Sequence, residues 1–102
     1  MHNITSTKSW GALEKLHAEK SRTTLRDLFR ADAQRAQRYT FDAAGLRVDL
    51  SKNLVDGDVA KQLLALADEA GLKDRIEAMF NGERINTTED RAVLHTALRA
   101  PE

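Results

Sequence analysis

Apolar residues recur at helical spacing through most of the chain, which predicts a mainly helical fold. The first helix is expected over residues 7–20, where Ser6 or Thr7 can accept a hydrogen bond from a free N–H group of the first turn. A shorter helix is expected after the capping residues Thr23 and Thr24.

The period of the pattern changes near Tyr39, where another short helix, capped by Asp32, is expected to end. From there to residue 50, apolar and polar residues alternate on both sides of the sequence Ala-Ala-Gly. Period two on either side of a short glycine-containing loop predicts a β-hairpin near residues 39–50. Because a lone hairpin is only marginally stable in water, this one is expected to pack on helices or to join a sheet.

The helical pattern then returns in the second half of the chain. Asp56 is placed to cap the longest apolar stripe, and Gly71 has the position of the residue that follows a helix end. A further helix is expected from Leu72 onward, ended by Gly82. The prediction is one small unit, mostly α with one β-hairpin, without internal repeats.

The last helix is expected to begin at Asn86 or Thr87, since each precedes an acidic residue at the spacing of a capping box. Arg91, His95 and Arg99 are spaced by four residues and would share one face of this helix. Two guanidinium groups and an imidazole can bind a phosphate or a carboxylate. The alternative is a solvated or inter-domain face with structural ion pairs. These three residues are the candidate site, for anion binding or for inter-domain contact.

Composition narrows the range of functions. The 102 residues include sixteen basic and sixteen acidic side chains, a balance that argues against a dedicated nucleic-acid or anionic-membrane binder. The absence of cysteine excludes disulfides and thiolate chemistry, and His2, His17 and His95 lack the spacing of a zinc site. No signal peptide and no apolar run of the ~20 residues that span a membrane are found. We expect an intracellular protein with no metal, no cofactor and no membrane contact.

No catalytic set of residues can be assembled from the sequence, but residues 62–80 have the outline of a helix-turn-helix. The second helix of this unit would carry Lys73 and Arg75, together with Asp74 and Glu77, which would repel a phosphate backbone. An autonomous helical interaction module that binds nucleic acid through this run is kept as the alternative function.

Three motifs occur in the order and spacing of glucose-6-phosphate isomerases, and the chain strongly resembles that family. The motifs are "SKN" at 51–53, "MFNGERIN" at 79–86 and "TEDRAVLHTALR" at 88–99. The upstream sequences "SWGALEKLHAE" and "LRDLFRADAQR" are similar to the opening helices of the family. The chain departs from the family at Leu50, where an aromatic residue is common, and residues 30–42 are the least typical.

The resemblance implies that residues 1–102 form an N-terminal helical segment ahead of the first complete sugar-isomerase domain. The family's enzymes are α/β proteins with two such domains, each a parallel sheet flanked by helices. They interconvert glucose 6-phosphate and fructose 6-phosphate in glycolysis and gluconeogenesis, through an enediol and a glutamate base, without a cofactor, as cytoplasmic homodimers.

The resemblance also implies that the family's phosphate-binding loop and its catalytic glutamate, histidine and lysine lie downstream of this segment. No motif that carries these roles is present in the 102 residues, so we assign no catalytic residue. The segment is expected to be structural and inactive alone, with the remaining domains of the enzyme as its partner and Arg91, His95 and Arg99 holding it to them. When isolated, such a segment is expected to expose apolar patches and to self-associate.

Overall fold

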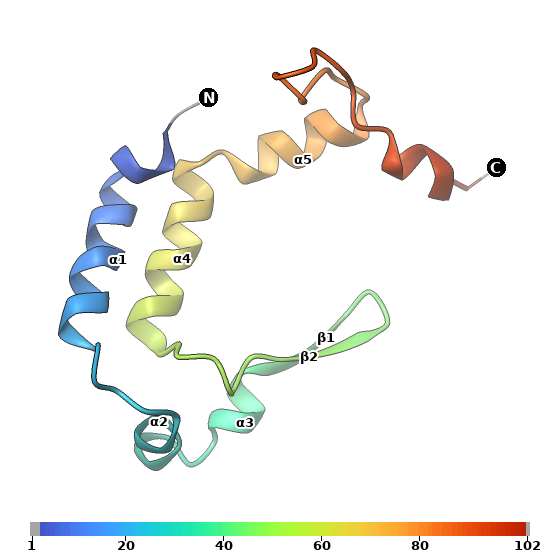
Figure 1. The fold of residues 1–102 in the computed structure, drawn as a ribbon. Helices are drawn as coiled ribbons and strands as arrows, with labels where there is room; N and C mark the ends of the chain where they lie inside the picture. Colours follow the sequence, from blue (N-terminus) through green and yellow to red (C-terminus); the bar gives the residue numbers. More distant parts are fainter. Residues whose placement is uncertain (1–2, 102) are drawn as a thin grey trace.

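The computed structural model describes residues 3–101, which form five α-helices, two short 3₁₀ helices (η1, η2) and one β-hairpin (Figure 1). This arrangement confirms the prediction of a mostly helical unit with one hairpin. The elements are, in chain order, η1 Ile4–Ser6, α1 Lys8–Glu19, α2 Leu25–Ala31, α3 Arg35–Arg38, β1 Thr40–Ala43, β2 Leu46–Asp49, α4 Gly57–Glu69, α5 Leu72–Phe80 and η2 His95–Arg99.

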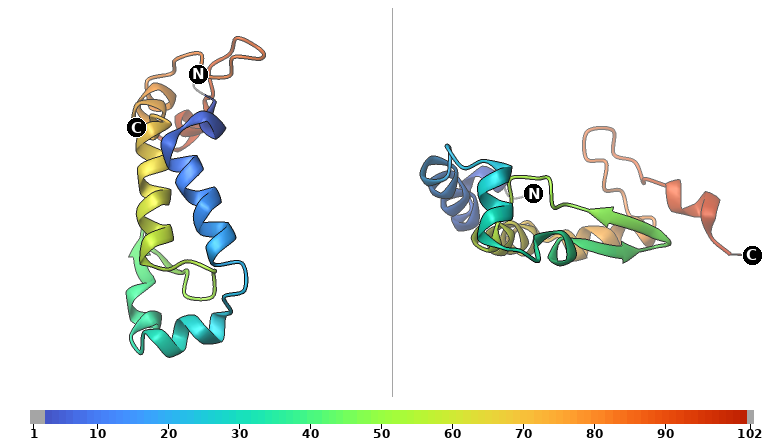
Figure 2. Two further views of the ribbon diagram at one scale, coloured as in Figure 1. Left: turned by 90° about the vertical axis from the view of Figure 1, so that its left-hand side faces the viewer. Right: turned by 90° about the horizontal axis from the view of Figure 1, so that it is seen from below.

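Helices α1 and α4 lie side by side and antiparallel, and they form the main packed unit (Figures 1 and 2). Both begin as the sequence predicts. The Thr7 hydroxyl accepts from the backbone N–H of Trp10 at 3.2 Å, and the Asp56 carboxylate accepts from the N–H of Val59 at 3.0 Å.

A groove of about 390 Å³ runs between α1, α2 and α4. Its apolar lining is made by Trp10, Leu13, Leu16, Leu28, Leu54, Val59 and Leu63.

Polar contacts tie the two helices together at both ends. At one end, the carboxylate of Glu69 accepts from the backbone N–H of Ser9 at 3.2 Å. At the other end, the ammonium of Lys20 pairs with Asp56 and lies 3.5 Å from the carboxylate of Asp58. The apolar stripes of α1 and α4 are therefore held in register by hydrogen bonds that involve charged groups.

Helix α2 begins with a complete capping box, in which Thr24 and Asp27 each accept from the other's backbone N–H. The predicted cap of α3 is wrong. Asp32 ends α2, and α3 starts after Gln34, which makes no side-chain cap. The reason is that the Asp32 carboxylate is used in a tighter turn, where it accepts from the N–H of Gln34 at 3.0 Å and from Arg38 at 2.7 Å.

The predicted hairpin is confirmed. Strands β1 and β2 pair antiparallel, with Thr40 opposite Asp49 and Ala43 opposite Leu46. Ala44 and Gly45 form the two-residue loop with φ of 50° and 78°, the left-handed conformations that a tight hairpin turn requires.

The predicted last helix is wrong. Asn86 and Arg91 instead exchange backbone hydrogen bonds of 3.0 and 3.1 Å as an isolated antiparallel bridge, and Asp90 between them has a φ of 52°. The capping-box contact does form, since the Glu89 N–H donates to the Asn86 side chain at 3.3 Å, but it closes this turn. The Arg91 N–H is already bonded to Asn86, so an α-helix cannot propagate through it. Only the 3₁₀ helix η2 follows, from His95.

The described chain is open and has little core. Its radius of gyration is 17.5 Å, whereas a compact domain of this length has about 13 Å. The hairpin, and α5 with the segment after it, extend from opposite ends of the α1–α4 pair toward the same side (Figures 1 and 2). Among residues 3–101, no apolar side chain is fully buried, and the buried residues are Ser9, Arg35 and Ser51. The expectation of exposed apolar surface is thus confirmed.

Candidate functional site

The structure does not bring the three candidate site residues onto one helical face. Arg91 lies in the turn that follows Asn86, with its guanidinium 3.7 Å from the carboxylate of Glu89. His95 and Arg99 are at the two ends of η2. The shared helical face is therefore a wrong prediction, because the backbone bridge at Arg91 removes the helix that would have aligned the three side chains. Their role in anion binding or in inter-domain contact stays a prediction.

His95 and Arg99 do line a common hollow, which has a volume of about 640 Å³ and lies between the end of α5 and η2. Its other lining residues are Met79, Phe80, Gly82, Leu94, Thr96, Ala97, Ala100 and Pro101. Most of this lining is apolar, and Phe80 and Leu94 are themselves exposed. An apolar hollow with one guanidinium and one imidazole at its border suits an amphipathic surface better than it suits a small free anion.

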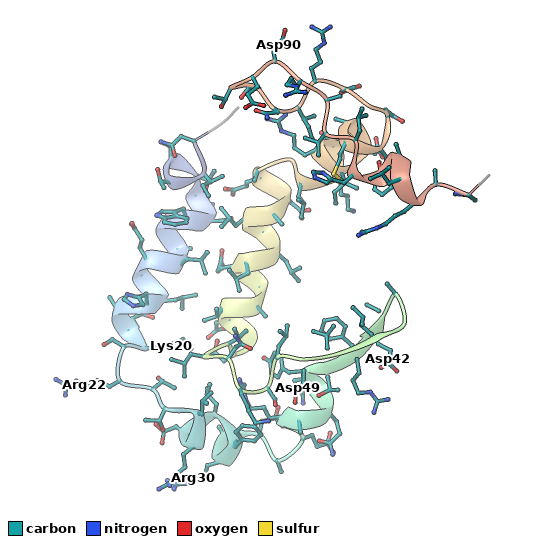
Figure 3. The ribbon with its side chains drawn as sticks, turned by 45° about the vertical axis from the view of Figure 1, so that its right-hand side comes forward. Lys20, Arg22, Arg30, Asp42, Asp49 and Asp90 are labelled. Carbon is teal, nitrogen blue, oxygen red and sulfur yellow. The ribbon has the colours of Figure 1, made fainter. Side chains whose placement is uncertain are left out.

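Residues 20–38 carry six basic side chains and two acidic ones, and the fold disperses this local surplus of positive charge. Lys20 is paired with Asp56, and Arg38 is paired with Asp32 at 2.7 Å. Arg22 and Arg30 point outward from separate places (Figure 3). The surplus therefore does not form one basic patch of the kind that tracks a phosphate backbone.

The best-organised polar cluster was not predicted from the sequence, and its centre is Arg35. The guanidinium of this buried residue donates to three backbone carbonyls, those of Ser51 at 2.8 Å, Asn53 at 2.7 Å and Val55 at 2.7 Å. The ring of Tyr39 lies with its centroid 4.6 Å from the guanidinium carbon. The available signal was Tyr39 at i+4 from Arg35, which is the spacing for a stacked pair on a helix.

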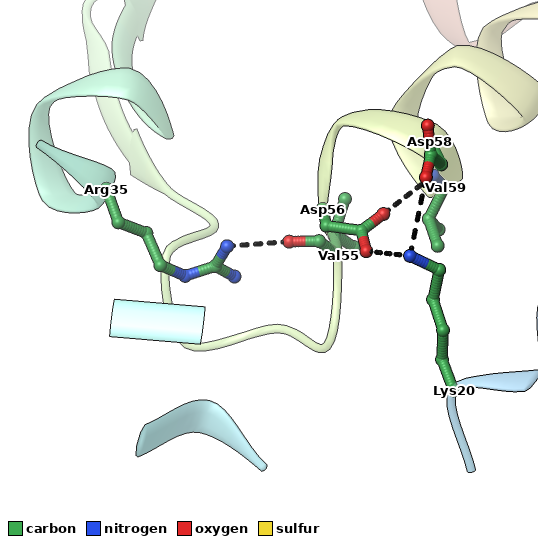
Figure 4. Close-up of polar contacts among 6 residues, drawn as sticks. All are labelled: Lys20, Arg35, Val55, Asp56, Asp58 and Val59. Carbon is green, nitrogen blue, oxygen red and sulfur yellow. Dashed lines mark hydrogen bonds and ion pairs between the residues drawn. The ribbon is translucent and has the colours of Figure 1, made fainter. Parts of the chain in front are cut away.

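At the start of α4, next to this cluster, Lys20 forms ion pairs with two carboxylates. Figure 4 shows Arg35 contacting the carbonyl of Val55 while Lys20 contacts the carboxylates of Asp56 and Asp58. Burial opposes ionisation of Asp56, but the hydrogen bonds from Lys20 and from the Val59 N–H outweigh it and lower its pKa. The hydrogen bond to Asp56 raises the pKa of Lys20 in turn.

The helix-turn-helix outline at 62–80 corresponds to α4 and α5, joined through Gly71 with φ of 71°. On α5, the basic residue Lys73 is followed directly by the acidic residue Asp74, and both are exposed. The alternative function, nucleic-acid binding through this run, stays a prediction.

The described residues form few constellations that could do chemistry. Within residues 3–101, no three histidine, aspartate or glutamate side chains come together as metal ligands, and His2 lies outside the described part. In the same range, none of the helices has both the length and the apolar character needed to cross a membrane.

Comparison with known proteins matches this chain to one family. The family model for phosphoglucose isomerase matches residues 49–102, which include the loop held by Arg35, α4, α5 and η2. The glucose-6-phosphate isomerase of Corynebacterium efficiens is 60% identical over 100 residues, and that of Frankia casuarinae is 54% identical over 99. The enzyme of the same name from Ectopseudomonas mendocina is 44% identical over 100 residues. These alignments cover 97–98% of this chain and 18% of each relative, so the chain spans about a fifth of the length of the relatives it matches.

Proposed function

Since the chain belongs to the phosphoglucose isomerase family, we propose that it is a structural segment of a glucose-6-phosphate isomerase. The observation that carries this proposal is the combination of two facts. The chain aligns over 98% of its length with only 18% of a curated relative, and its residues 3–101 bury no apolar side chain completely. A segment that packs against a larger body needs little core of its own.

Helix α5 offers the clearest surface for such packing. Leu72, Ile76 and Phe80 are spaced by four residues and are 51%, 43% and 64% exposed. A helix of a folded protein normally turns such a stripe toward a core. The proposed occupant of this face is the remainder of the isomerase, which would also cover the hollow beside η2.

His95 and Arg99 are proposed as contacts at the border of that interface, with Arg91 in the neighbouring turn. Their cationic and imidazole groups border apolar surface, as polar residues do at the rim of an interface. This assignment makes them binding residues between parts of the enzyme and gives them no step in the chemistry.

The isomerisation itself is assigned to the rest of the enzyme. The proposed whole protein interconverts glucose 6-phosphate and fructose 6-phosphate, acts as a homodimer in the cytoplasm and requires no cofactor. Proton transfer between adjacent carbons needs a carboxylate base and groups that bind the phosphate. The described residues contain no such assembled set, so the 102-residue chain is proposed to be inactive alone.

The experiment is reconstitution from two pieces. The 102-residue chain is mixed with the Corynebacterium efficiens enzyme from which the matching 100 residues have been removed. Each piece alone should show no isomerisation in an assay coupled to glucose-6-phosphate dehydrogenase, and the mixture should show it. Turnover by the 102-residue chain alone, or failure of the mixture to associate and turn over, would overturn the proposal.

A matched pair of variants locates the interface. Ile76→Glu places a charge in the exposed stripe of α5, whereas Lys73→Glu places the same charge on its polar side. The first should raise the concentration of chain needed for half-maximal activity by at least about tenfold, because burying an unpaired carboxylate costs more than 1.4 kcal/mol. The second should leave it within about twofold. Equal effects would place the interface elsewhere.

A further inference from the structure

We infer that Arg35 is a positioning residue, whose guanidinium sets the path of residues 51–55 and thereby the place where α4 begins. The inference comes from the contacts of a single buried cation. It goes beyond the proposed function, because it concerns how this chain shapes its own loop.

The geometry leaves the guanidinium little freedom. Its three nitrogens donate to the carbonyls of Ser51, Asn53 and Val55, at distances between 2.7 and 2.8 Å. These carbonyls belong to alternate residues, so the loop must curl around the guanidinium to present all three to it. Arg35 and Ser51 are each only 2% exposed, whereas the side chains of residues 52–54 in the same loop are exposed.

Two aromatic rings hold the guanidinium from the side. The centroid of Tyr39 is 4.6 Å from the guanidinium carbon and that of Phe29 is 5.6 Å from it. Phe29 belongs to α2 and Tyr39 directly follows α3, so the cation joins α2 and the end of α3 to the loop. Among the described residues, no carboxylate lies within ion-pair distance of it, and the charge is stabilised by carbonyl dipoles and ring faces.

The loop turn has its own backbone hydrogen bonds, which report on its shape. The N–H of Asn53 donates to the carbonyl of Leu50 at 3.0 Å, and the N–H of Val55 donates to that of Asn53 at 2.8 Å. Directly after Val55 comes Asp56, which caps α4 and receives Lys20 (Figure 4). The start of α4 is therefore held by Arg35 on one side and by Lys20 on the other.

Lysine cannot replace arginine in this role. An ammonium is a compact point charge on a flexible stem, whereas the planar guanidinium offers its donors in a fixed fork and stacks on aromatic rings. Arg35→Lys should therefore keep the charge and lose the loop geometry. This separates positioning by the guanidinium from a general need for a cation.

The test is amide hydrogen exchange of the full 102-residue chain, read at Asn53 and Val55. The variants are Arg35→Lys, Arg35→Ala and the control Arg30→Ala, which removes an exposed arginine of α2. Protection at both amides should fall about tenfold or more in the two Arg35 variants, because each lost hydrogen bond involved a charged donor. It should stay unchanged in Arg30→Ala and in the amides of α1. Millimolar ethylguanidinium should restore protection in Arg35→Ala.

Three results would overturn the inference: equal protection in all variants, full protection in Arg35→Lys, or no protection of these amides in the unsubstituted chain. A second readout, which rests on the proposed function, uses the reconstituted enzyme. Arg35→Lys should raise the concentration of chain needed for half-maximal activity and leave the KM for the sugar phosphate unchanged. Failure of the unsubstituted chain to reconstitute would count against the proposed function, while the exchange data would still decide the role of Arg35.

Discussion

Two glycines should respond to the same substitution with opposite signs. Gly71 joins α4 to α5 with φ of 71° and ψ of 35°, and Gly11 lies inside α1. A Cβ added at either position meets no atom within 4 Å. Steric collision therefore contributes nothing at either site, and the backbone conformation alone decides the effect of Gly71→Ala and Gly11→Ala on stability.

The magnitudes follow from the two conformations. A left-handed backbone brings Cβ close to the following carbonyl oxygen, so Gly71→Ala should reduce the free energy of unfolding by roughly 1–2 kcal/mol. Gly11→Ala should increase it by roughly 0.5–1 kcal/mol, because alanine loses less backbone entropy than glycine when a helix forms. Gly71→Asn should fall between wild type and Gly71→Ala, since asparagine tolerates the left-handed region.

The assay is urea unfolding of the 102-residue chain, followed by far-UV circular dichroism at several protein concentrations. The two alanine variants should differ by about 2 kcal/mol in the free energy of unfolding. A neutral or stabilising Gly71→Ala would contradict this prediction, because it would mean that α4 and α5 do not meet in this left-handed turn. A strongly destabilising Gly11→Ala would show that a neighbouring group contacts α1 at this position.

Three further predictions use other features of the structure. The hydrogen bond from the Ser9 N–H is the main cause of the lowered pKa of Glu69, and the pKa of Asp56 is lowered although burial opposes it. The stability that these two carboxylates contribute is therefore complete above their unfolded pKa values of about 4 and is lost as the pH falls through the folded values. Helicity measured by circular dichroism should fall on acidification, and a rise would contradict this. Thr24→Ala, which removes the capping box of α2, should cost about 1 kcal/mol in the same urea assay, with Thr23→Ala near zero as its control. The exposed apolar surface should make the isolated chain self-associate in sedimentation velocity, and a monodisperse compact monomer at all concentrations would count against it.

Most local elements could be predicted because their signals are local. Thr7, Thr24 and Asp56 cap α1, α2 and α4 with their own side chains, and Gly71 takes the left-handed conformation that ends α4. A cap and an apolar period involve residues within one or two turns of each other, so the sequence displays all the partners. The hairpin was predictable for the same reason, since a two-residue turn sets its register.

The prediction of the last helix was wrong because the same residues can cap a helix or close a turn. Asn86 and Glu89 have capping-box spacing, and their contact forms, but the backbone bridge from Asn86 to Arg91 uses it to close a turn. The candidate site was lost with the helix, because the grouping of Arg91, His95 and Arg99 depended on a regular helical spacing. Pattern alone gives no energy difference between a capped helix and a closed turn.

The helical class, the hairpin, most caps and, through the motifs, the family follow from the sequence alone. The three-dimensional structure was needed to find that Arg35 is buried against the carbonyls of residues 51–55 and that the stripe of α5 is uncovered. The physical reason is range. Caps and periods are contacts between near neighbours, whereas the partners of Arg35 are backbone carbonyls sixteen to twenty residues away that carry no side-chain signature.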